Sequence, residues 1–180
     1  MTKPAPAKYQ TTPWKAYNAA LKARGSLMIW LDRDTQWPGA PHGKRGRTRT
    51  FSDAAIQFCL TIKCLFNLAL RQAVGMVQRL LKLAGLNWPT PDFSTVCRRQ
   101  KDLQVAIPYR PTTTGLQTIW KNWSGYHRRS LVETRMRCFK LLGERVMARD
   151  FDRQVAELQI RAAILNRFTH LGTPTTVRMA

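Results

Sequence analysis

Residue types that handle metal ions and phosphates recur at helical spacing in the last third of the chain, at Tyr126, Arg129, Glu133 and Lys140. Their spacings are three, four and seven, so on a helix of about 100° per residue they share an arc of roughly 60°. An acid, two cations and a phenol on one narrow face suit a metal ion held beside a phosphate backbone. Apolar residues gather on roughly the opposite side, namely Leu131, Val132, Phe139, Leu142 and Val146. We therefore expect a helix that packs one face and presents the other.

The order Y-x2-R-x3-E-x6-K resembles the C-terminal signature of bacterial insertion-sequence transposases of the DDE type. The resemblance continues through KLLGERVMARDFDRQVAELQIRAAILN and includes the earlier segments YNAALKARGSLMIWLD, GKRGRTRTFSDAAIQ, LRQAVGMVQRLLKLAGLNWPTPDFSTVCRRQK and VAIPYR. It implies that Glu133 is the third acid of an Asp-Asp-Glu set that binds divalent metal, with Mg²⁺ as the cofactor. It also implies phosphate contacts for Tyr126, Arg129 and Lys140.

The same resemblance implies two aspartate motifs, similar to D-[ST]-T-G and D-G-[AG]-Y-D, and neither string is present. Two-metal phosphoryl chemistry needs several carboxylates converging on ions about 3.5–4 Å apart, so Glu133 alone cannot hold such a pair. The sequence therefore resembles a transposase joined across an internal deletion between Arg110 and Lys121, with the catalytic sheet missing. The structural alternative makes Glu133 a surface residue paired with Arg129 or Arg137, worth about 0.2–0.5 kcal/mol.

The charge of the chain is strongly positive, with 30 Lys and Arg against 10 Asp and Glu and a formal net charge of +20. This excess favours binding to a polyanion, because each neutralised phosphate releases counterions; the alternative is an unusually basic soluble protein. Within the segment Gln36 to Thr50, four cations surround two glycines: Lys44, Arg45, Arg47 and Arg49. Such a segment either follows a minor groove or serves as a solvated linker.

The four cysteines, Cys59, Cys64, Cys97 and Cys138, show no C-x2-C spacing, which argues against a zinc site. Reduced thiols without a signal peptide indicate a bacterial cytoplasmic protein, and DNA binding would associate it with the nucleoid. The apolar stretch Ile56 to Leu70 contains polar residues and is too short to span a bilayer, so we expect no membrane partner.

Three helices are predicted between residues 52 and 105. Ser52 caps a helix to about Asn67, apolar spacing predicts a second from Leu70 to a stop at Gly85, and Asp92 or Ser94 caps a third that runs to about Val105. This order is similar to a helix-turn-helix, with the third helix reading DNA. Its candidate DNA-binding residues are Ser94, Thr95, Arg98, Arg99 and Lys101. The alternative is a three-helix bundle with a solvated charged face.

A last helix is predicted from Asp150 to Phe168, where Gly172 and Pro174 follow. Its apolar stripe consists of Phe151, Val155, Leu158, Ala162 and Leu165, which we expect to pack within the chain. The predicted fold class is mainly α: an N-terminal helix-turn-helix-like unit plus C-terminal helices left from a ribonuclease H-like core whose sheet is missing. The expected division is 1–50 (mobile arm, short helix and basic linker), 51–108 (helical DNA-binding unit), 109–120 (junction), 121–172 (catalytic-domain remnant) and 173–180 (tail).

Three functions follow from these observations. The first is a transposase-family protein that binds the terminal repeats of its element as double-stranded DNA, cannot cut it alone, and competes with an intact transposase. The second is an enzyme completed by another subunit or reading frame. The third is a basic RNA-binding protein. Tight binding to structured RNA without preference for duplex DNA would favour the third.

Overall fold

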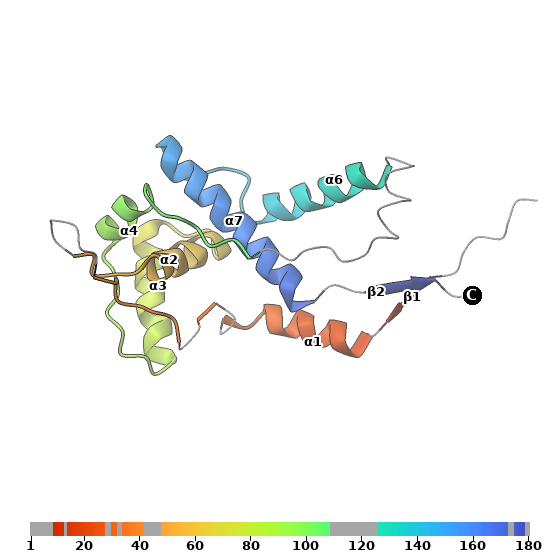
Figure 1. Cartoon of the computed structure of the whole chain (residues 1–180), viewed down its shortest axis with the longest axis horizontal. Coiled ribbons are helices and arrows are strands. Elements are labelled where there is room, and N and C mark those ends of the chain that lie inside the picture. Colours follow the sequence, from red (N-terminus) through yellow and green to blue (C-terminus); the bar gives the residue numbers. More distant parts are fainter. Residues whose placement is uncertain are drawn as a thin grey trace, which may run out of the picture.

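A computed structural model of the chain describes residues 9–12, 14–27, 30–31, 34–41, 48–108, 126–172 and 175–178. Within these ranges the protein is mainly helical, as the sequence predicts (Figure 1). The helices are α1 (Trp14–Arg24), α2 (Asp53–Leu65), α3 (Leu70–Leu83), α4 (Phe93–Arg99), α6 (Tyr126–Leu141) and α7 (Phe151–Leu171).

Two short strands join segments from opposite ends of the sequence. β1 (Tyr9–Thr12) pairs antiparallel with β2 (Thr175–Arg178), with Tyr9 opposite Arg178 and Thr12 opposite Thr175. We expected a mobile arm and a tail here, and that expectation is wrong for these two segments. Both are rich in threonine, whose branched Cβ favours extended backbone. Both segments therefore favour the strand conformation that a two-stranded ladder requires.

Helix α2 is the centre of the molecule, packed against α3, α4 and α7. Its sequence is apolar on nearly every side, and a helix of that kind must be surrounded by other elements. Its buried residues are Ala55, Ile56, Phe58, Cys59, Leu60, Thr61, Ile62, Lys63 and Cys64. The predicted start of α2 is confirmed, because the Ser52 hydroxyl accepts the Ala55 backbone N–H at 3.1 Å. The helix ends at Leu65, two residues before the predicted end near Asn67, which has a φ of 49°.

Helix α4 is shorter than predicted. It begins after Asp92, whose carboxylate accepts the Ser94 N–H at 3.1 Å, but it ends at Arg99 rather than near Val105. The Gln100 side chain donates to the Arg153 carbonyl oxygen at 2.9 Å, and Gln57 bonds both backbone groups of Ala106 at 3.0–3.1 Å. These contacts hold the segment after α4 along α2 and α7, so tertiary partners replace the helical hydrogen bonds there.

The predicted apolar stripe of α7 does not form its buried face. Phe151 is 74% exposed and Leu158 is 40% exposed. The buried residues are Ala156, Glu157, Ile160, Arg161, Ala163 and Ile164. At about 100° per residue these lie on roughly the opposite side of the helix from the predicted stripe. The prediction failed because it excluded Glu157 and Arg161 from the core, whereas both are paired inside it.

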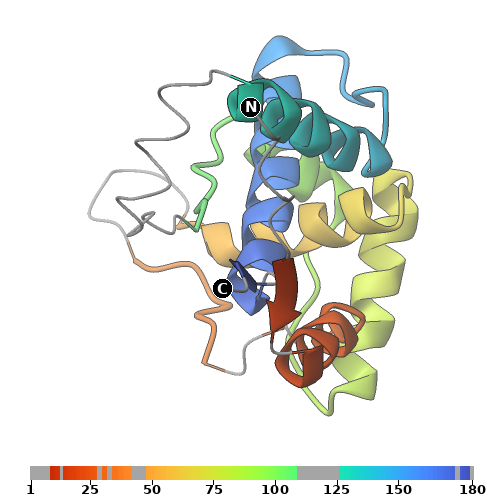
Figure 2. The ribbon, with the colours of Figure 1, turned by 90° about the vertical axis from the view of Figure 1, so that its right-hand side faces the viewer.

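One hydrophobic core crosses the boundary that we expected between the helical unit and the C-terminal segment. Ile160 and Ile164 of α7 belong to the same buried cluster as Ile56 of α2, Val77 of α3 and Val96 of α4. Figure 2 shows α7 passing alongside α2, and α6 also contacts α7. The domain boundaries remain a prediction, but α7 contributes to the stability of the helical unit.

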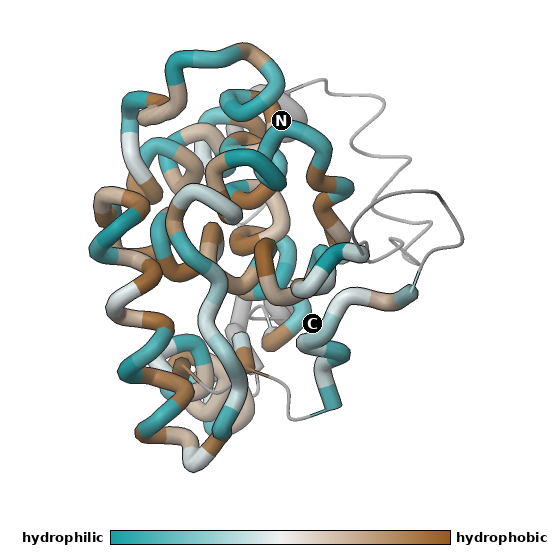
Figure 3. The backbone as a smooth tube through the Cα atoms, turned by 90° about the vertical axis from the view of Figure 1, so that its left-hand side faces the viewer, coloured by the Kyte–Doolittle hydropathy of each residue, from teal (hydrophilic) through white to brown (hydrophobic). Residues whose placement is uncertain are grey.

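Among the described residues, no single helix is long and apolar enough to cross a membrane. The pair α2 and α3 reaches that length and composition only together, and it bends by 111° at the break. The backbone coloured by hydropathy in Figure 3 shows hydrophilic and hydrophobic positions alternating along the helices on this face of the molecule. That alternation is what surface helices with one buried side require.

Candidate nucleic-acid interface

Both ends of the basic linker are held to one another. The Gly39 N–H donates to the Thr50 carbonyl oxygen at 3.0 Å, and the Ser52 N–H donates to the Trp37 carbonyl oxygen at 3.1 Å. Gly39 is required at this crossing, because a Cβ there would come within 2.0 Å of the Arg49 carbonyl oxygen. The loop that this crossing closes carries four of the predicted DNA-binding residues, of which Lys44, Arg45 and Arg47 lie outside the described residues.

Asp53 at the start of α2 forms ion pairs with two of the predicted DNA-binding cations, Arg99 and Arg49. The Arg99 guanidinium donates to the Asp53 carboxylate and, at 2.9 Å, to the Phe51 carbonyl oxygen. The Arg49 guanidinium lies 4.0 Å from the same carboxylate but is half exposed. The Arg99 side chain is only 14% exposed. Arg99 therefore connects α4 to the start of α2, and its side chain presents little surface to a phosphate.

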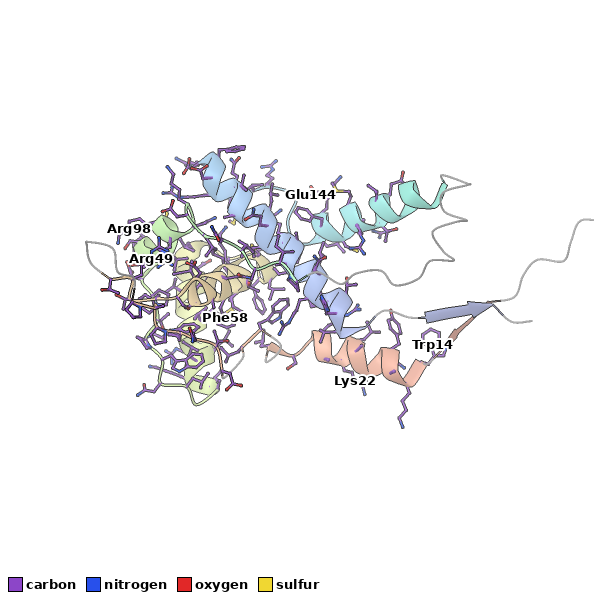
Figure 4. The ribbon with its side chains drawn as sticks, in the orientation of Figure 1. Trp14, Lys22, Arg49, Phe58, Arg98 and Glu144 are labelled. Atoms are coloured by element: carbon purple, nitrogen blue, oxygen red, sulfur yellow. The ribbon has the colours of Figure 1, made fainter. Side chains whose placement is uncertain are left out.

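The other predicted residues around α4 differ in what their side chains contact. The Ser94 hydroxyl donates to the Asp92 carboxylate at 2.5 Å, and Lys101 lies 3.7 Å from the Asp152 carboxylate. Thr95 is half-buried, whereas Arg98 is exposed. Figure 4 shows Arg98 and Arg49 at the α4 end of the helical core. Of the α4 residues, Arg98 is thus the cation best placed to meet an outside anion.

Helix α6 carries the predicted signature residues, and most of its described side chains, Val132–Leu141, are exposed. Glu133 and Lys140 are exposed, while the side chains of Tyr126 and Arg129 lie outside the described residues. The expected packing of its apolar side is wrong for Val132, which is 58% exposed. Near the end of α6 the Phe139 ring packs on α7, where the Arg161 guanidinium lies 5.9 Å from the ring centre.

We tested whether the described residues fit a divalent metal ion. No three of their His, Cys, Asp and Glu side chains come together as a ligand set. Magnesium is held through oxygen ligands in near-octahedral geometry, and Glu133 brings a single carboxylate on an exposed helix. The described residues thus do not fit the ion.

A buried charged cluster, which the sequence analysis missed, joins α2 to α7. The Glu157 carboxylate lies 3.1 Å from the Lys63 ammonium and 3.0 Å from the Arg161 guanidinium. It also accepts the backbone N–H groups of Met147 and Ala148 at 3.3 Å. All three charged side chains are at most 8% exposed. The sequence signal was the single Lys inside the apolar run of α2, which needs an acid from another element.

Arg161 also fixes the segment that connects α6 to α7. Its guanidinium donates to the carbonyl oxygens of Gly143 and, at 2.7 Å, Arg145. Gly143 has a φ of 124°, which side-chain-bearing residues rarely adopt, so the turn depends on glycine. Arg161 of α7 therefore positions the end of α6, the helix that carries the predicted signature residues.

A second feature missed by sequence reasoning is the exposed side of α3. The prediction used only its apolar positions, and Ala73, Val77 and Leu81 are indeed buried. Its cations Arg71, Arg79 and Lys82 are all exposed, and the helix contains no acid. The residue types of these three cations and their helical spacing could have been read from the sequence.

Burial and hydrogen bonding shift the pKa values of three groups. Burial raises the pKa of the Cys59 thiol to about 12 and that of Cys64 to about 11, so both thiols stay protonated and act as small apolar groups. The hydroxyl of Ser94, and then its backbone N–H, hold the pKa of Asp92 below its usual range. The cap of α4 is therefore charged at neutral pH.

The comparisons with known proteins identify the family. The model of the transposase DDE domain family matches residues 22–121, which is more than half of the chain. No solved structure matches the chain. The matched range includes α2, α3 and α4 and stops before the signature helix α6. The chain therefore belongs to the transposase DDE domain family.

Proposed function

We propose that this chain binds duplex DNA at the terminal repeats of an insertion sequence and that it cannot cut that DNA on its own. The observation that carries the proposal is the family match over the helical part of the chain, whose exposed helix positions include Arg71, Arg79, Lys82 and Arg98. Transposases of this family act on DNA. A net charge of +20 provides a large electrostatic contribution to binding any duplex.

The catalytic part of the proposal rests on the missing aspartate motifs and on the position of Glu133. DDE transposases generally use Mg²⁺, and α6 and α7 are the helices that we assign to a ribonuclease H-like core. The match to the family ends at residue 121, where the suspected deletion between Arg110 and Lys121 also ends. A lone carboxylate on an exposed helix leaves an ion mostly water-ligated, so in-line attack is not organised.

An electrophoretic mobility shift experiment tests the DNA-binding proposal. The probes are a duplex that carries the terminal repeats of the element encoding the chain and a scrambled duplex of equal length and composition. We expect tighter binding to the terminal repeats, and a regulatory chain should also displace an intact transposase from them. Equal affinity for both duplexes would contradict sequence-specific recognition. Tight binding to structured RNA without binding to duplex DNA would replace the proposal with an RNA-binding role.

A further inference from the structure

Helices α2 and α3 have the geometry of a helix-turn-helix. Residues 66–69 connect them, and the two axes bend by 111°. Helix-turn-helix pairs have turns of three to four residues and helices about 90–120° apart, with the second helix in the major groove. Asn67 takes the left-handed conformation often given to glycine, with a φ of 49°, and the Leu68 N–H donates to the Lys63 carbonyl oxygen at 3.0 Å. The turn between α2 and α3 therefore has a defined backbone conformation held by this hydrogen bond.

The exposed side of α3 has the composition of a DNA-reading face. At about 100° per residue, its central positions fall within an arc of roughly 100°. These positions are Arg71, Gly75, Gln78, Arg79 and Lys82, all of them exposed. Among the described residues none of the three cations forms an ion pair, although the Arg71 guanidinium lies 4.4 Å from the centre of the Phe93 ring. Arginine and glutamine are the side chains that pair bidentately with guanine and adenine.

Gly75 at the centre of this face is a second, independent observation. A glycine in a helix interior is unfavourable relative to alanine. Packing within the protein does not explain it, because a Cβ at Gly75 would meet no atom within 4 Å. An absent side chain between Arg71 and Arg79 lets an outside surface approach the α3 backbone closely.

We infer that α3 is the recognition helix of this chain and that it enters the major groove of duplex DNA with Gly75 at the point of closest approach. This inference rests on the proposed function and assigns the reading surface within it. Gln78 and Arg79 contact base edges, Arg71 and Lys82 contact phosphates, and Arg98 of α4 extends the phosphate contacts. The predicted reading helix α4 instead supports α3, because it packs against both α2 and α3 and Arg99 is bonded to Asp53.

The first test compares two double variants that each remove two positive charges. In the full chain, Arg79→Ala with Lys82→Ala changes α3, and Lys15→Ala with Lys22→Ala changes exposed cations of α1, which Figure 1 shows apart from α3. We expect the α3 variant to lose the preference for terminal repeats over scrambled duplex by about 5- to 150-fold. Its log–log salt slope should fall by about one, because Lys82 is the phosphate contact that this variant removes. The α1 variant should keep the preference.

The second test is Gly75→Leu, which adds a side chain on the exposed face while favouring the helix. We expect a melting temperature equal to or above that of the wild type, with binding to the terminal repeats weakened by about tenfold or more. Unchanged preference in both α3 variants would overturn the inference and leave the proposed function intact. Failure of the wild-type chain to prefer terminal repeats would overturn both.

Discussion

Helices α6 and α7 carry the same local charge pattern in opposite environments. Glu133 and Arg137 of α6 are four residues apart, as are Glu157 and Arg161 of α7. On α6 both residues are exposed, whereas on α7 the Glu157 carboxylate bonds Arg161 in the core and also meets Lys63 of α2. The spacing alone therefore does not determine what such a pair does.

The difference follows from where each helix packs. α7 lies against α2, whose buried Lys63 must have a partner, because an unpaired ammonium in the core is costly. α6 packs on α7 only near its end, so its Glu133 remains at the surface. Glu133, which the sequence predicts as the third acid of the catalytic set, is thus exposed, while Glu157, which belongs to no predicted motif, connects two helices.

The largest expected effect is that of Glu157→Ala. Removal of this carboxylate leaves Lys63 and Arg161 buried without their acid, so we expect a decrease of about 3–5 kcal/mol in the free energy of unfolding. The matched change on α6, Glu133→Ala, should cost less than about 0.5 kcal/mol. Urea denaturation followed by circular dichroism measures both. Similar decreases in the two variants would break the comparison between α6 and α7.

The cysteines sharpen the comparison between the buried core and α6, because the burial of a thiol makes stability depend on pH. Burial raises the pKa of Cys59 and Cys64 from 9.0 to about 12 and 11, whereas Cys138 on α6 is half-buried. A raised pKa in the folded state means that the stabilisation is complete below pH 9 and is lost as pH rises from there towards 11. By about pH 10 the decrease in stability should be about 1.4 kcal/mol for each thiol, on the order of 2.5–3 kcal/mol for the pair.

Urea midpoints at neutral and alkaline pH measure this decrease. The double variant Cys59→Ala with Cys64→Ala should weaken the pH dependence. An undiminished pH dependence in this variant would mean that these two thiols are not its source.

The contrast between buried and exposed charge is repeated in adjacent residues of α4. Arg99→Ala removes the hydrogen bonds to Asp53 and the Phe51 carbonyl oxygen, so we expect a destabilisation of about 1 kcal/mol, given that Asp53 is partly exposed. Arg98→Ala should leave stability within about 0.5 kcal/mol. Thermal denaturation of the two variants at equal ionic strength compares them, and a larger destabilisation by Arg98→Ala would reverse the assignment.

Arg98→Ala should instead change DNA binding. Because this variant neutralises one phosphate fewer, the magnitude of the log–log salt slope should fall by about one, without altered sequence preference. Fluorescence anisotropy with terminal-repeat duplex over a salt series measures the slope. Glu144→Gln, an exposed change beyond α6, is the control for general effects of surface substitution, although it alters charge in the opposite direction.

The smallest expected effect is that of Glu133→Gln on catalysis. Neither the wild-type chain nor this variant should nick or join terminal-repeat DNA with magnesium or manganese, because one carboxylate does not organise in-line attack. Cleavage products resolved on a denaturing gel provide the measurement. Cleavage by the purified chain that Glu133→Gln abolishes would overturn the proposal of an incomplete enzyme and would restore α6 as a catalytic site.

The sequence predicted the elements whose signals are local. Ser52 and Gly85 mark the start of α2 and the end of α3 through capping and a left-handed turn, and both features are confirmed. The end of α4 could not be predicted, because Gln100 and the segment after it bond to α2 and α7, which are distant in sequence. The buried face of α7 was assigned to the wrong side for a similar reason, since its charged residues are neutralised by Lys63 from another helix.

By itself the sequence determined that the chain is helical and basic, and it carried the resemblance to a transposase family that the match over residues 22–121 confirms. Tertiary structure alone decided which charges are available to a partner. Arg98 and Arg99 are neighbours of the same type, yet one is exposed and the other is bonded to Asp53. Helical period and composition act along one element, but desolvation and ion pairing depend on the element packed against it, and that neighbour is set only by the fold.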